Sequence, residues 1–423
     1  MPLILPGNVA SALGGAFEVA NSCRFNDGDS PRLHKTPGSA GNRRTFTFSF
    51  WVKRCTLGAY QPLFDIGGNW ADFKDDDTLR VGINATGSSS THRVTNRVFR
   101  DVSAWYHIVI RVDTTQGTAA NRLRIYINGT EETSMGTSAD VTQDADTDVN
   151  NTGVHDILND QSRYFDGYAA EIVLLDGTSA APTEFGEFDE DSPTIWKPKD
   201  VSGLSFGTNG FYLDFEDSSN LGNDANGGTD LTEVNLAAAD QSVDTPTNNA
   251  CTLNSLAVAT SSALAFSEGN NKIYHSGSGW RPAYGTFPVS EGKWYFEVKG
   301  LLFPGTSYIQ IGWVSLEYTG GGDSALTDEI QGWGNTAPAA VYDSRLGKVY
   351  WQNVSTNGTT AYGDSYTAGD VIGVALDLDN DNIYFAEDNT WKNSGDPTSG
   401  STGTGAFSIV SGYTWVPFIG LNN

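Results

Sequence analysis

The stretch "RLRIYINGTEE", residues 122–132, alternates long side chains over six positions and then reaches Asn128-Gly129. Such alternation is typical of a half-buried strand, and both Asn and Gly tolerate the positive φ that a tight hairpin turn needs. The stretch therefore predicts a β-hairpin. A second stretch, "GDVIGVALDLDNDNIYF" at 369–385, has the same form, with an Asp/Asn turn between two apolar runs. The chain is therefore expected to hold two related antiparallel modules.

Period-two segments recur along the chain in two sets. The first set covers 45–52, 105–112, 122–127 and 169–175; the second covers 293–298, 308–314, 348–353, 371–378, 382–387 and 415–421. The 48 glycines and only two methionines argue against long helices. Short strands separated by Gly, Asn and Asp turns predict an all-β protein made of two antiparallel β-sandwiches of jelly-roll type.

The domain boundaries follow from composition. Residues 216–249 are polar, acidic and poor in apolar side chains, so we expect 201–244 to be an acidic linker or surface loop. The sandwiches are then expected at 17–200 and 245–423. Within the first of them, "APTEFGEFDED" at 181–191 predicts a short helical turn.

Residues 1–16 are expected to form an N-terminal docking arm. Their sequence is apolar and contains glycine and proline, so we expect it to dock on a sandwich or on a neighbouring chain. The segment has no positively charged n-region, and Pro6-Gly7 interrupts its apolar run, so no signal peptide is expected. Membrane insertion is not expected either, because no stretch approaches the ~20 apolar residues of a membrane span.

The charge balance is strongly acidic, with a formal net charge of −26 and basic residues that never cluster beyond pairs such as Arg43-Arg44. Binding to a phosphate backbone needs a basic stripe, so nucleic acid is not an expected partner. The three cysteines, Cys23, Cys55 and Cys251, are odd in number and lack metal-like spacing. They predict reduced thiols in a protein made in a cytoplasm.

Landmarks in the first half of the chain resemble the concanavalin-A-like laminin-G family over residues 17–190. They are, in order, "TFSFWVKR", "WYHIVIRVD", "RLRIYINGTEE" and "YFDGYAAEIVLLDG". The most specific feature is a Tyr-x-Asn-Gly hairpin followed by a Gly-x-x-x-Glu-Ile strand that ends in Asp-Gly. Its residues here are Gly167, Glu171, Ile172, Asp176 and Gly177. The resemblance implies a concanavalin-A-like sandwich.

From about residue 245 the chain resembles a SPRY domain, which is itself a concanavalin-A-like sandwich. The matching stretches are "GKWYFEV", "IQIGWVS", "GDVIGVALDLDNDNIYFAEDNTW" and "VPFIGL". A SPRY sandwich usually continues beyond the Pro-Phe strand, here Pro417-Phe418. The resemblance therefore implies that further chain or a neighbouring chain completes the sheet.

The combination of these domains with the opening "MPLILPGNVASA" is similar to virion proteins of tailed bacteriophages. This resemblance implies a non-enzymatic structural protein, made in the host cytoplasm and located in the virion, with other virion proteins as partners. The favoured role is a tail fibre or spike component that binds host-surface polysaccharide. The alternatives are a capsid or tail decoration protein that binds only virion partners and, third, a polysaccharide depolymerase. A homo-oligomer would form through sandwich faces or the arm, because no coiled-coil heptads occur.

The sequence offers one weak candidate for glycoside hydrolysis. Glucanases of the concanavalin-like fold place acid and nucleophile as alternating carboxylates on one strand, and "EFGEFDEDS" has Glu187, Asp189 and Asp191 at that spacing. The intervening residues are not both apolar, and Ser192-Pro193 ends the run, so we expect no catalytic residues. The five histidines lie apart, and His107 is expected to be a satisfied strand residue.

Two kinds of binding residue are expected instead. Trp70, Trp280 and Trp333 lie in stretches rich in Gly, Ser and Asn, where flat rings beside polar groups suit carbohydrate binding. For Trp70, Trp280 and Trp333 the alternative is that the rings only pack on the edges of the sandwiches. Trp51, Trp105 and Trp294 follow strand alternation and are assigned to the core.

The acidic loops 71–78 and 144–156 offer oxygen ligands to a hard cation. Asp75, Asp77, Asp144 and Asp146 are the candidate calcium ligands. Solvated acidic loops are the favoured interpretation, and neither loop matches an EF-hand because Val149 stands where the glycine is required. No other cofactor is expected.

Overall fold

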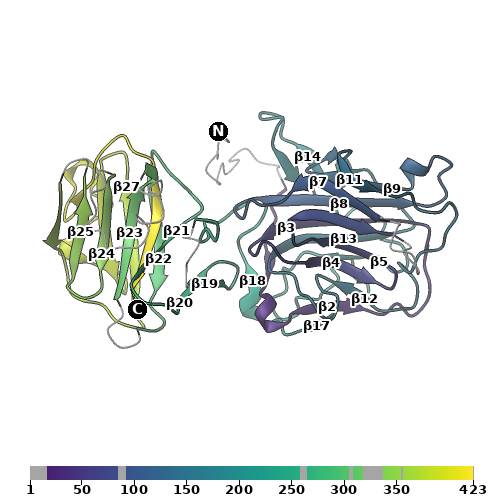
Figure 1. Ribbon diagram of the computed structural model, residues 1–423, viewed down its shortest axis with the longest axis horizontal. Helices are drawn as coiled ribbons and strands as arrows, with labels where there is room; N and C mark the ends of the chain where they lie inside the picture. The colour runs from purple at the N-terminus through teal and green to yellow at the C-terminus, as the bar shows by residue number, and fades with distance from the viewer. Residues whose placement is uncertain are drawn as a thin grey trace. The chain divides into compact units, whose positions relative to one another are not determined.

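The computed structural model describes residues 17–83, 92–257, 264–303, 308–317, 337–353 and 356–422. The chain divides into two compact units. Residues 17–250 with Ser267–Gly269 form the N-terminal unit, and the described residues of 251–266 and 270–422 form the C-terminal unit. In Figure 1 the first runs from purple to teal and the second from green to yellow. The expected docking arm, residues 1–16, lies outside the described residues.

Two antiparallel sheets make up most of the N-terminal unit. Sheet A has the order β10 (Thr130–Glu131), β9 (Leu123–Ile127), β8 (Trp105–Asp113), β3 (Thr45–Arg54), β13 (Gly167–Asp176), β1 (Ser22–Phe25) and β18 (Gln241–Ser242), with β16 (Phe211–Leu213) paired to β13. Sheet B has the order β11 (Met135–Ser138), β7 (His92–Val98), β6 (Thr78–Gly82), β5 (Asn69–Phe73), β4 (Gln61–Ile66), β12 (His155–Ile157), β2 (Arg32–Lys35) and β17 (Thr232–Val234). A two-stranded ribbon, β14 (Gly186–Phe188) with β15 (Trp196–Pro198), completes the unit.

Alternating residues of both sheets bury one shared core. Phe46, Phe48 and Phe50 on β3 are fully buried in it. Phe48 stacks on Phe64 of sheet B with ring centroids 4.4 Å apart. Since alternate strand residues point to opposite faces, the intervening residues of each strand face away from this core. The expected all-β sandwich is confirmed for this unit.

The predicted hairpin of residues 122–132 is confirmed. β9 ends at Ile127, β10 begins at Thr130, and the two turn residues Asn128 and Gly129 have φ of 47° and 76°. Both residues are therefore left-handed, as a tight two-residue hairpin turn requires. The second predicted hairpin is also confirmed, with β27 (Val371–Asp377) paired to β28 (Asn382–Glu387).

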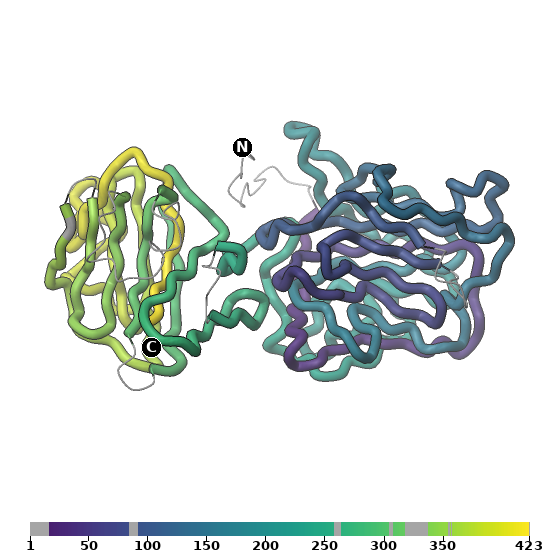
Figure 2. Tube along the Cα trace, in the orientation of Figure 1, coloured from purple at the N-terminus to yellow at the C-terminus, as the bar shows by residue number. Residues whose placement is uncertain are grey.

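The segment 201–244 corrects the expectation of a linker. It contributes β16 to sheet A beside β13, β17 to sheet B beside β2, and β18 to sheet A beside β1. In Figure 2 this teal segment runs against the purple strands of the N-terminal unit. Its low apolar content misled the prediction, because β17 and β18 hold no fully buried residue and β16 holds only three, while the backbones of all three pair with longer strands. Near residues 181–191, only Pro182–Glu184 forms a 3-10 turn.

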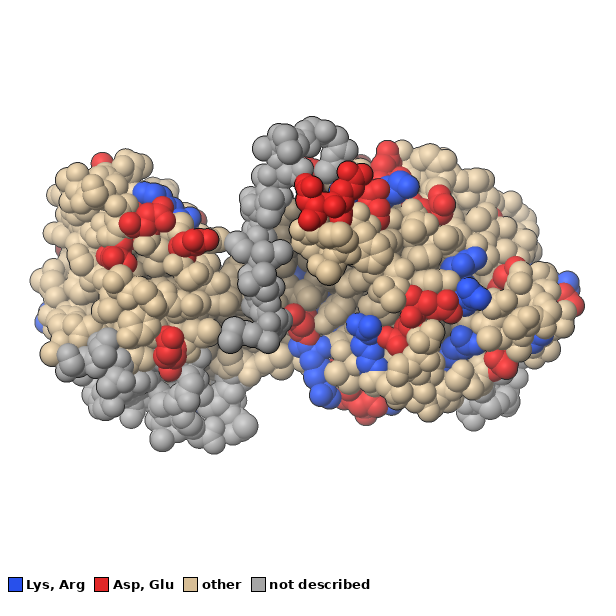
Figure 3. All heavy atoms as spheres, turned by 90° about the horizontal axis from the view of Figure 1, so that it is seen from above, with Lys and Arg blue, Asp and Glu red and all other residues tan. Residues whose placement is uncertain are grey.

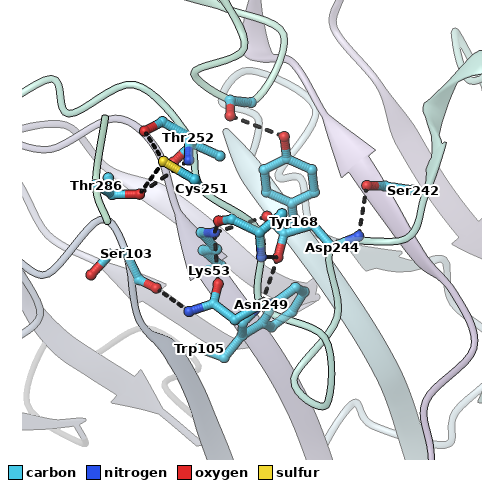
Figure 4. Close-up of polar contacts among 12 residues, drawn as sticks. Lys53, Ser103, Trp105, Tyr168, Ser242, Asp244, Asn249, Cys251, Thr252 and Thr286 are labelled. Atoms are coloured by element: carbon cyan, nitrogen blue, oxygen red, sulfur yellow. Dashed lines mark hydrogen bonds and ion pairs between the residues drawn. The ribbon is translucent and has the colours of Figure 1, made fainter. Parts of the chain in front are cut away.

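A buried polar cluster holds the end of this segment on sheet A. The Lys53 ammonium donates to Asp244 Oδ2 at 2.8 Å, to Asn249 Oδ1 at 2.9 Å and to the Ala250 carbonyl at 2.9 Å. The Trp105 indole N–H donates to Asp244 Oδ1 at 3.0 Å. Figure 4 shows these groups converging on Asp244. Because Lys53 is fully buried, its charge depends on this carboxylate for compensation.

We predict that Asp244→Ala lowers the free energy of unfolding of the N-terminal unit by roughly 3–5 kcal/mol, because it leaves a buried ammonium without its counter-charge. Chemical denaturation of the full chain measures this loss. The exposed Asp191→Asn is the control and should leave the unfolding free energy within about 0.5 kcal/mol of the parent. A loss below ~1 kcal/mol for Asp244→Ala would show that this cluster does not fasten the segment.

The outer face of sheet A holds a second, smaller apolar cluster around His107. Trp51, only 3% exposed, stacks on the His107 ring at a centroid distance of 4.6 Å. The Trp196 indole N–H donates to His107 Nδ1 at 2.9 Å, so the other ring nitrogen carries the proton and bonds Ser49 Oγ at 2.8 Å. Burial lowers the pKa of His107 to about 3. His107 is thus the satisfied strand histidine that the sequence predicts, and Trp51 is buried as expected.

A buried carboxyl group on β13 makes the stability of the N-terminal unit depend on pH. Glu171 lies at a bulge of the strand with φ 49°, and its Oε2 accepts a 2.7 Å hydrogen bond from the Tyr212 hydroxyl. Burial raises the pKa of Glu171 from 4.5 to about 8, opposed by the Tyr212 hydrogen bond. The folded state therefore binds this proton more tightly than the unfolded state does. The stabilisation that comes from this tighter proton binding is complete below pH 4.5 and is lost as the pH rises towards about 8.

We predict that the melting temperature of Glu171→Gln minus that of the parent increases as the pH rises from 5 to 9. The amide keeps a partner for Tyr212 and never acquires charge, whereas Glu171 ionises in this range. Parallel thermal melts of parent and variant at each pH give the difference directly. A difference that stays constant across this range would contradict the proposed titration of Glu171.

The C-terminal unit is also a pair of antiparallel sheets. Sheet C has the order β21 (Trp280–Tyr284), β31 (Trp415–Asn422), β23 (Tyr308–Ser315), β24 (Ala339–Asp343), β25 (Lys348–Gln352) and β26 (Asn357–Ala361). Sheet D has the order β22 (Lys293–Lys299), β27, β28 and β29 (Thr390–Trp391), with β30 (Phe407–Ser408) paired to β28. β19 (Leu264–Ser267) and β20 (Lys272–His275) form a separate ribbon. The core between sheets C and D includes Trp313, Tyr342 and Phe385.

Helical structure is minimal in the described parts of both units. The 3-10 turns are three residues long: Asp27–Asp29, Ala119–Asn121, Pro182–Glu184, Ala238–Asp240, Lys392–Ser394 and Gly400–Thr402. Of the described residues, none belongs to a helix with the length and apolar character needed to cross a membrane.

Candidate functional site

A row of side chains crosses the outer face of sheet B. Strand register pairs Gly82 with Trp70, Trp70 with Asp65, Asp65 with Asp156, and Asp156 with His34. Residues directly opposite one another in antiparallel strands share a face of the sheet, so these five positions form one transverse row. We call it the sheet B row. Strand neighbours such as Phe64, Ala71, Val81 and Ile157 belong to the core, so the row faces outward.

Trp70 lies over Gly82, where the missing side chain leaves room for the indole. A Cβ at position 82 would lie 2.4 Å from Cε2 and Cζ2 of that ring. The Arg80 guanidinium carbon is 4.2 Å from the Trp70 ring centroid, and the His92 ring lies 5.9 Å away. The indole is half-buried. Trp70 is therefore held in place by its neighbours while part of it stays open to solvent.

Two arginines flank the row on the same face. Arg80 donates to both carboxylate oxygens of Asp72, at 3.0 and 2.6 Å, from the adjacent strand. The Tyr60 ring lies 5.3 Å from the Arg80 guanidinium carbon and 5.0 Å from that of Arg163. Arg163 in turn donates from Nε to Asp160 at 2.6 Å. Arginine, aromatic ring and carboxylate thus alternate across this part of the sheet, and the positive charges are held by bidentate or short bonds.

Two carboxylates stand side by side at the centre of the row. Asp156 is only 3% exposed; its Oδ2 accepts a 2.7 Å hydrogen bond from Gln161, while its buried Oδ1 has no partner among the described residues. Burial, and then the negative charges of Asp160 and Asp156, raise the pKa of Asp65 to about 6. At neutral pH Asp65 therefore carries its charge, and the Oδ1 of the neighbouring Asp156 is left without a hydrogen bond from the described residues.

The arrangement suits a ligand rich in hydroxyl groups. An indole can stack on the C–H face of a sugar ring, and carboxylate oxygens accept hydrogen bonds from hydroxyls. His34, at the far side of Asp156, has a buried Nδ1 without a partner among the described residues. The row thus combines one flat apolar surface with several unsatisfied polar atoms, as specific small-ligand sites do.

The structure places the predicted tryptophans differently from expectation. Trp70 lies on strand β5 rather than in a turn, yet it occupies the sheet B row. Trp280 begins strand β21 and is 8% exposed, with the Arg345 guanidinium carbon 5.8 Å from its ring. Stretches rich in Gly, Ser and Asn thus form strands at both positions. Trp333 lies outside the described residues. Trp105 is buried as expected, whereas Trp294 is only half-buried.

Sequence reasoning missed the carboxylates of the row. Asp65 lies in "PLFDIG" between Phe64 and Ile66, and Asp156 lies in "GVHDIL" between His155 and Ile157; each is a single acidic residue in a largely apolar stretch. That pattern, an isolated Asp on a strand, was the available signal. Their adjacency could not be read from the sequence because it arises from the pairing of strands about 90 residues apart in the chain.

The candidate calcium ligands are not gathered into one site. Asp77 is buried and bonds Arg54 at 3.2 Å and Arg100 at 2.8 Å, and Asp146 pairs with Arg44 at 2.6 Å. Asp75 and Asp144 are exposed. Across the described ranges, no group of three or more His, Cys, Asp or Glu side chains is arranged to hold a metal ion. Two of the four carboxylates, those of Asp77 and Asp146, thus form ion pairs with arginines.

The weak hydrolase candidate does not form an alternating catalytic strand. Glu187 and Asp189 both lie near the Lys197 ammonium, at 3.6 and 3.4 Å. Asp189 also accepts backbone hydrogen bonds from Asp191 and Ser192 at the turn between β14 and β15. These carboxylates therefore stabilise a short ribbon at the surface.

Charge on the surface is mixed. On the face drawn in Figure 3, Lys and Arg side chains lie among Asp and Glu and do not form a continuous basic stripe.

Comparison with known families identifies both sandwiches. Residues 27–181 match the Laminin_G_3 family, described as Concanavalin A-like lectin/glucanases superfamily. Residues 293–423 match the SPRY domain. The two domains that the sequence resembles are thus both found, and the chain is an all-β protein with a concanavalin-A-like domain followed by a SPRY domain.

Solved structures with similar folds are distant. A putative carbohydrate binding protein from Bacteroides ovatus is 15% identical with a TM-score of 0.36, and the match covers 51% of this chain and 58% of that protein, less than two thirds of its length. The heptameric SAP-like pentraxin of Limulus polyphemus is 15% identical with a TM-score of 0.28, covering 38% and 78% of the two chains. The SPRY domain of human HERC1 is 16% identical with a TM-score of 0.25, covering 36% and 81%. A search of curated proteins finds no match.

The close packing of the Trp70 indole on Gly82 gives a prediction for stability. Gly82→Ala should lower the free energy of unfolding by roughly 1–3 kcal/mol, because the new methyl group overlaps the indole. In a Trp70→Ala background the same change should cost less than about 0.5 kcal/mol, since the ring is gone. A double-mutant cycle by chemical denaturation measures the coupling. Equal costs in both backgrounds would show that the indole does not rest on Gly82.

Proposed function

We propose that the N-terminal unit binds carbohydrate, without hydrolysing it, on the outer face of sheet B. The observation that carries this proposal is the sheet B row, in which the Trp70 indole stands beside the Asp65 and Asp156 carboxylates. An oxygen of Asp156 is buried and without a partner among the described residues. Because this oxygen is closed to solvent, a sugar hydroxyl would have to displace the side chains that cover it, and it would then supply the missing hydrogen bond.

The chemistry of the row favours a neutral or cationic glycan over an acidic one at its centre. Asp65, Asp156 and Asp160 bring negative charge together, and after burial this charge is the next cause of the raised pKa of Asp65. The guanidinium groups of Arg80 and Arg163 are already occupied by carboxylates. An anionic sugar placed over the row would therefore meet like charges.

Hydrolysis is the second candidate, favoured by one observation. Asp65 has a raised pKa and stands opposite Asp156, as an acid and its partner carboxylate can in a glycosidase. However, the two carboxylates lie directly opposite each other on neighbouring strands, whereas the glucanase pattern places them at alternating positions of one strand. Side-by-side carboxylates are better placed to accept hydrogen bonds from two hydroxyls of one sugar.

The setting that we propose is the virion of a tailed phage, where the chain would be a tail fibre or spike component binding host-surface polysaccharide. The support is the resemblance of the opening "MPLILPGNVASA" and of the domain combination to such proteins. A decoration protein that binds only virion partners remains the alternative, and it predicts no glycan binding by either unit.

Glycan-array screening of the full chain, followed by calorimetric titration of the best ligand, tests carbohydrate binding. Trp70→Ala should weaken binding by about 1–3 kcal/mol, a typical value for loss of an aromatic stacking surface, and Asp156→Asn should weaken it by about tenfold or more. Gly82→Ala, which moves the ring without removing it, should also weaken binding. The control Asp191→Asn lies in a surface turn and should bind as the parent does.

Three outcomes would overturn the proposal. Failure of the chain to bind any glycan would favour the decoration role. Parent-like affinity in folded Trp70→Ala and Asp156→Asn variants would place a glycan site elsewhere. Release of new reducing ends from a bound polysaccharide, abolished by Asp65→Asn, would establish hydrolysis instead of simple binding.

A further inference from the structure

A lysine on the outer face of sheet A is enclosed between two aromatic residues. Strand register places Trp105 of β8 and Tyr168 of β13 directly opposite Lys53 of β3, one on each side. The Lys53 ammonium lies 5.8 Å from the Tyr168 ring centroid, and the lysine is fully buried. Its ammonium donates to three groups of the segment 244–250, which lies over this face of the sheet (Figure 4).

The three acceptors of this ammonium differ in their chemistry. Asp244 Oδ2, at 2.8 Å, belongs to a carboxylate, and the Ala250 carbonyl, at 2.9 Å, belongs to the backbone. The third acceptor, Asn249 Oδ1 at 2.9 Å, belongs to a side-chain amide. An amine is a nucleophile, a carboxylate can take up and return a proton, and an amide carbon is an electrophile. The cluster therefore holds the three groups that an amide exchange between side chains requires.

Two hydrogen bonds fix the orientation of the Asn249 amide. Its Oδ1 accepts from Lys53, and its Nδ2 donates to the Ser103 carbonyl at 2.8 Å. An ammonium only donates and a carbonyl only accepts, so the amide oxygen and nitrogen can be assigned. Since a carbonyl bond is ~1.23 Å long, Asn249 Cγ lies roughly 3–4 Å from Lys53 Nζ. Reacting atoms begin their approach at about 3–3.5 Å.

Asp244 is placed to move the proton of the ammonium. Its Oδ1 accepts from the Trp105 indole at 3.0 Å and from the Ala250 N–H at 3.1 Å, which leaves Oδ2 to face Lys53. Lysine and carboxylate are both buried, and a buried ion pair is costly because both charges lose their water. Transfer of one proton along the 2.8 Å hydrogen bond gives a neutral amine and a neutral acid, so both buried charges disappear.

We propose that Lys53 and Asn249 react to form a covalent amide, an isopeptide bond within the chain, and that Asp244 transfers the proton. Asp244 takes a proton from the ammonium, and the neutral Nζ attacks Asn249 Cγ. Nζ loses a second proton as the Cγ–Nδ2 bond breaks, and this nitrogen leaves as ammonia. Asp244 then returns its proton to the ammonia. The products are a secondary amide, an ammonium ion and the original carboxylate, so no oxidant or other co-reactant is needed.

The bond closes a loop that contains nearly the whole N-terminal unit. Lys53 and Asn249 are 196 residues apart in the chain. A cross-link stabilises the folded state by restricting the unfolded chain, and more so for a longer loop. All three cysteines of the chain are described and free, so a disulfide does not already close this loop. Asn249 and Ser103 are half-buried, which gives the departing ammonia a route to solvent.

Mass spectrometry of the purified full chain tests this inference. The parent should be lighter by one ammonia molecule than the mass calculated for the unlinked chain. After tryptic digestion, the peptide that contains Lys53 should be joined to the peptide that contains Asn249. Asn249→Ala should have its full calculated mass, because it lacks the amide. The matched control Asn248→Ala removes the amide of the exposed neighbouring residue and should be cross-linked as the parent is.

The same measurement on folded Asp244→Ala, isolated by gel filtration, tests the role of the carboxylate. This variant should stay unlinked, because no group is left to take the ammonium proton. Formation of the bond at the parental rate in this variant would contradict the role given to Asp244.

Three results for the parent would overturn the inference. Full calculated mass in the folded protein would show that Lys53, Asp244 and Asn249 form only an ion-paired cluster. Loss of one water molecule, with Asp244 at the junction of the joined peptides, would assign the bond to that carboxylate. Loss of ammonia without joined peptides would indicate an asparagine that has cyclised on its own backbone.

Discussion

The proposed site depends on the pairing of β12 with β4 and β2. β12 is only three residues long, yet its register places Asp156 beside Asp65 on one side and beside His34 on the other. Ile157 is held in the core, so Asp156 must face outward. A slip of one residue would bury the carboxylate and expose the isoleucine. The apolar core between sheets A and B thus determines which side chains form the outer row, and Gly82 provides the space in which Trp70 completes it.

Much of the fold could be predicted from local sequence. Asn128-Gly129 defined a hairpin because its positive φ values are a local requirement, and the alternation of "TFTFSFWV" gave β3 because its phenylalanines fill the core. Residues 201–244 escaped prediction because β16, β17 and β18 are each two or three residues long. Strands so short carry no readable periodicity, and their stability comes from pairing with longer strands and from buried contacts such as Lys53 with Asp244.

The candidate site was predictable only in part. Trp70 was singled out by its polar surroundings, but the same reasoning chose Trp280, which is 8% exposed whereas Trp70 is half-buried. Both lie on strands, so the difference in burial comes from tertiary packing, which the sequence does not reveal. Asp65 and Asp156 gain their importance from adjacency across strands. That adjacency is a property of tertiary pairing, whereas single-sequence patterns report local structure.

The most direct test of the account is a crystal structure of the full chain with an oligosaccharide that it binds. The account predicts a sugar ring stacked on the Trp70 indole, with a hydroxyl donating to Asp156 Oδ1 and another within hydrogen-bond distance of Asp65. An oligosaccharide bound in the C-terminal unit, or on the N-terminal unit away from sheet B, with the sheet B row left empty, would contradict it.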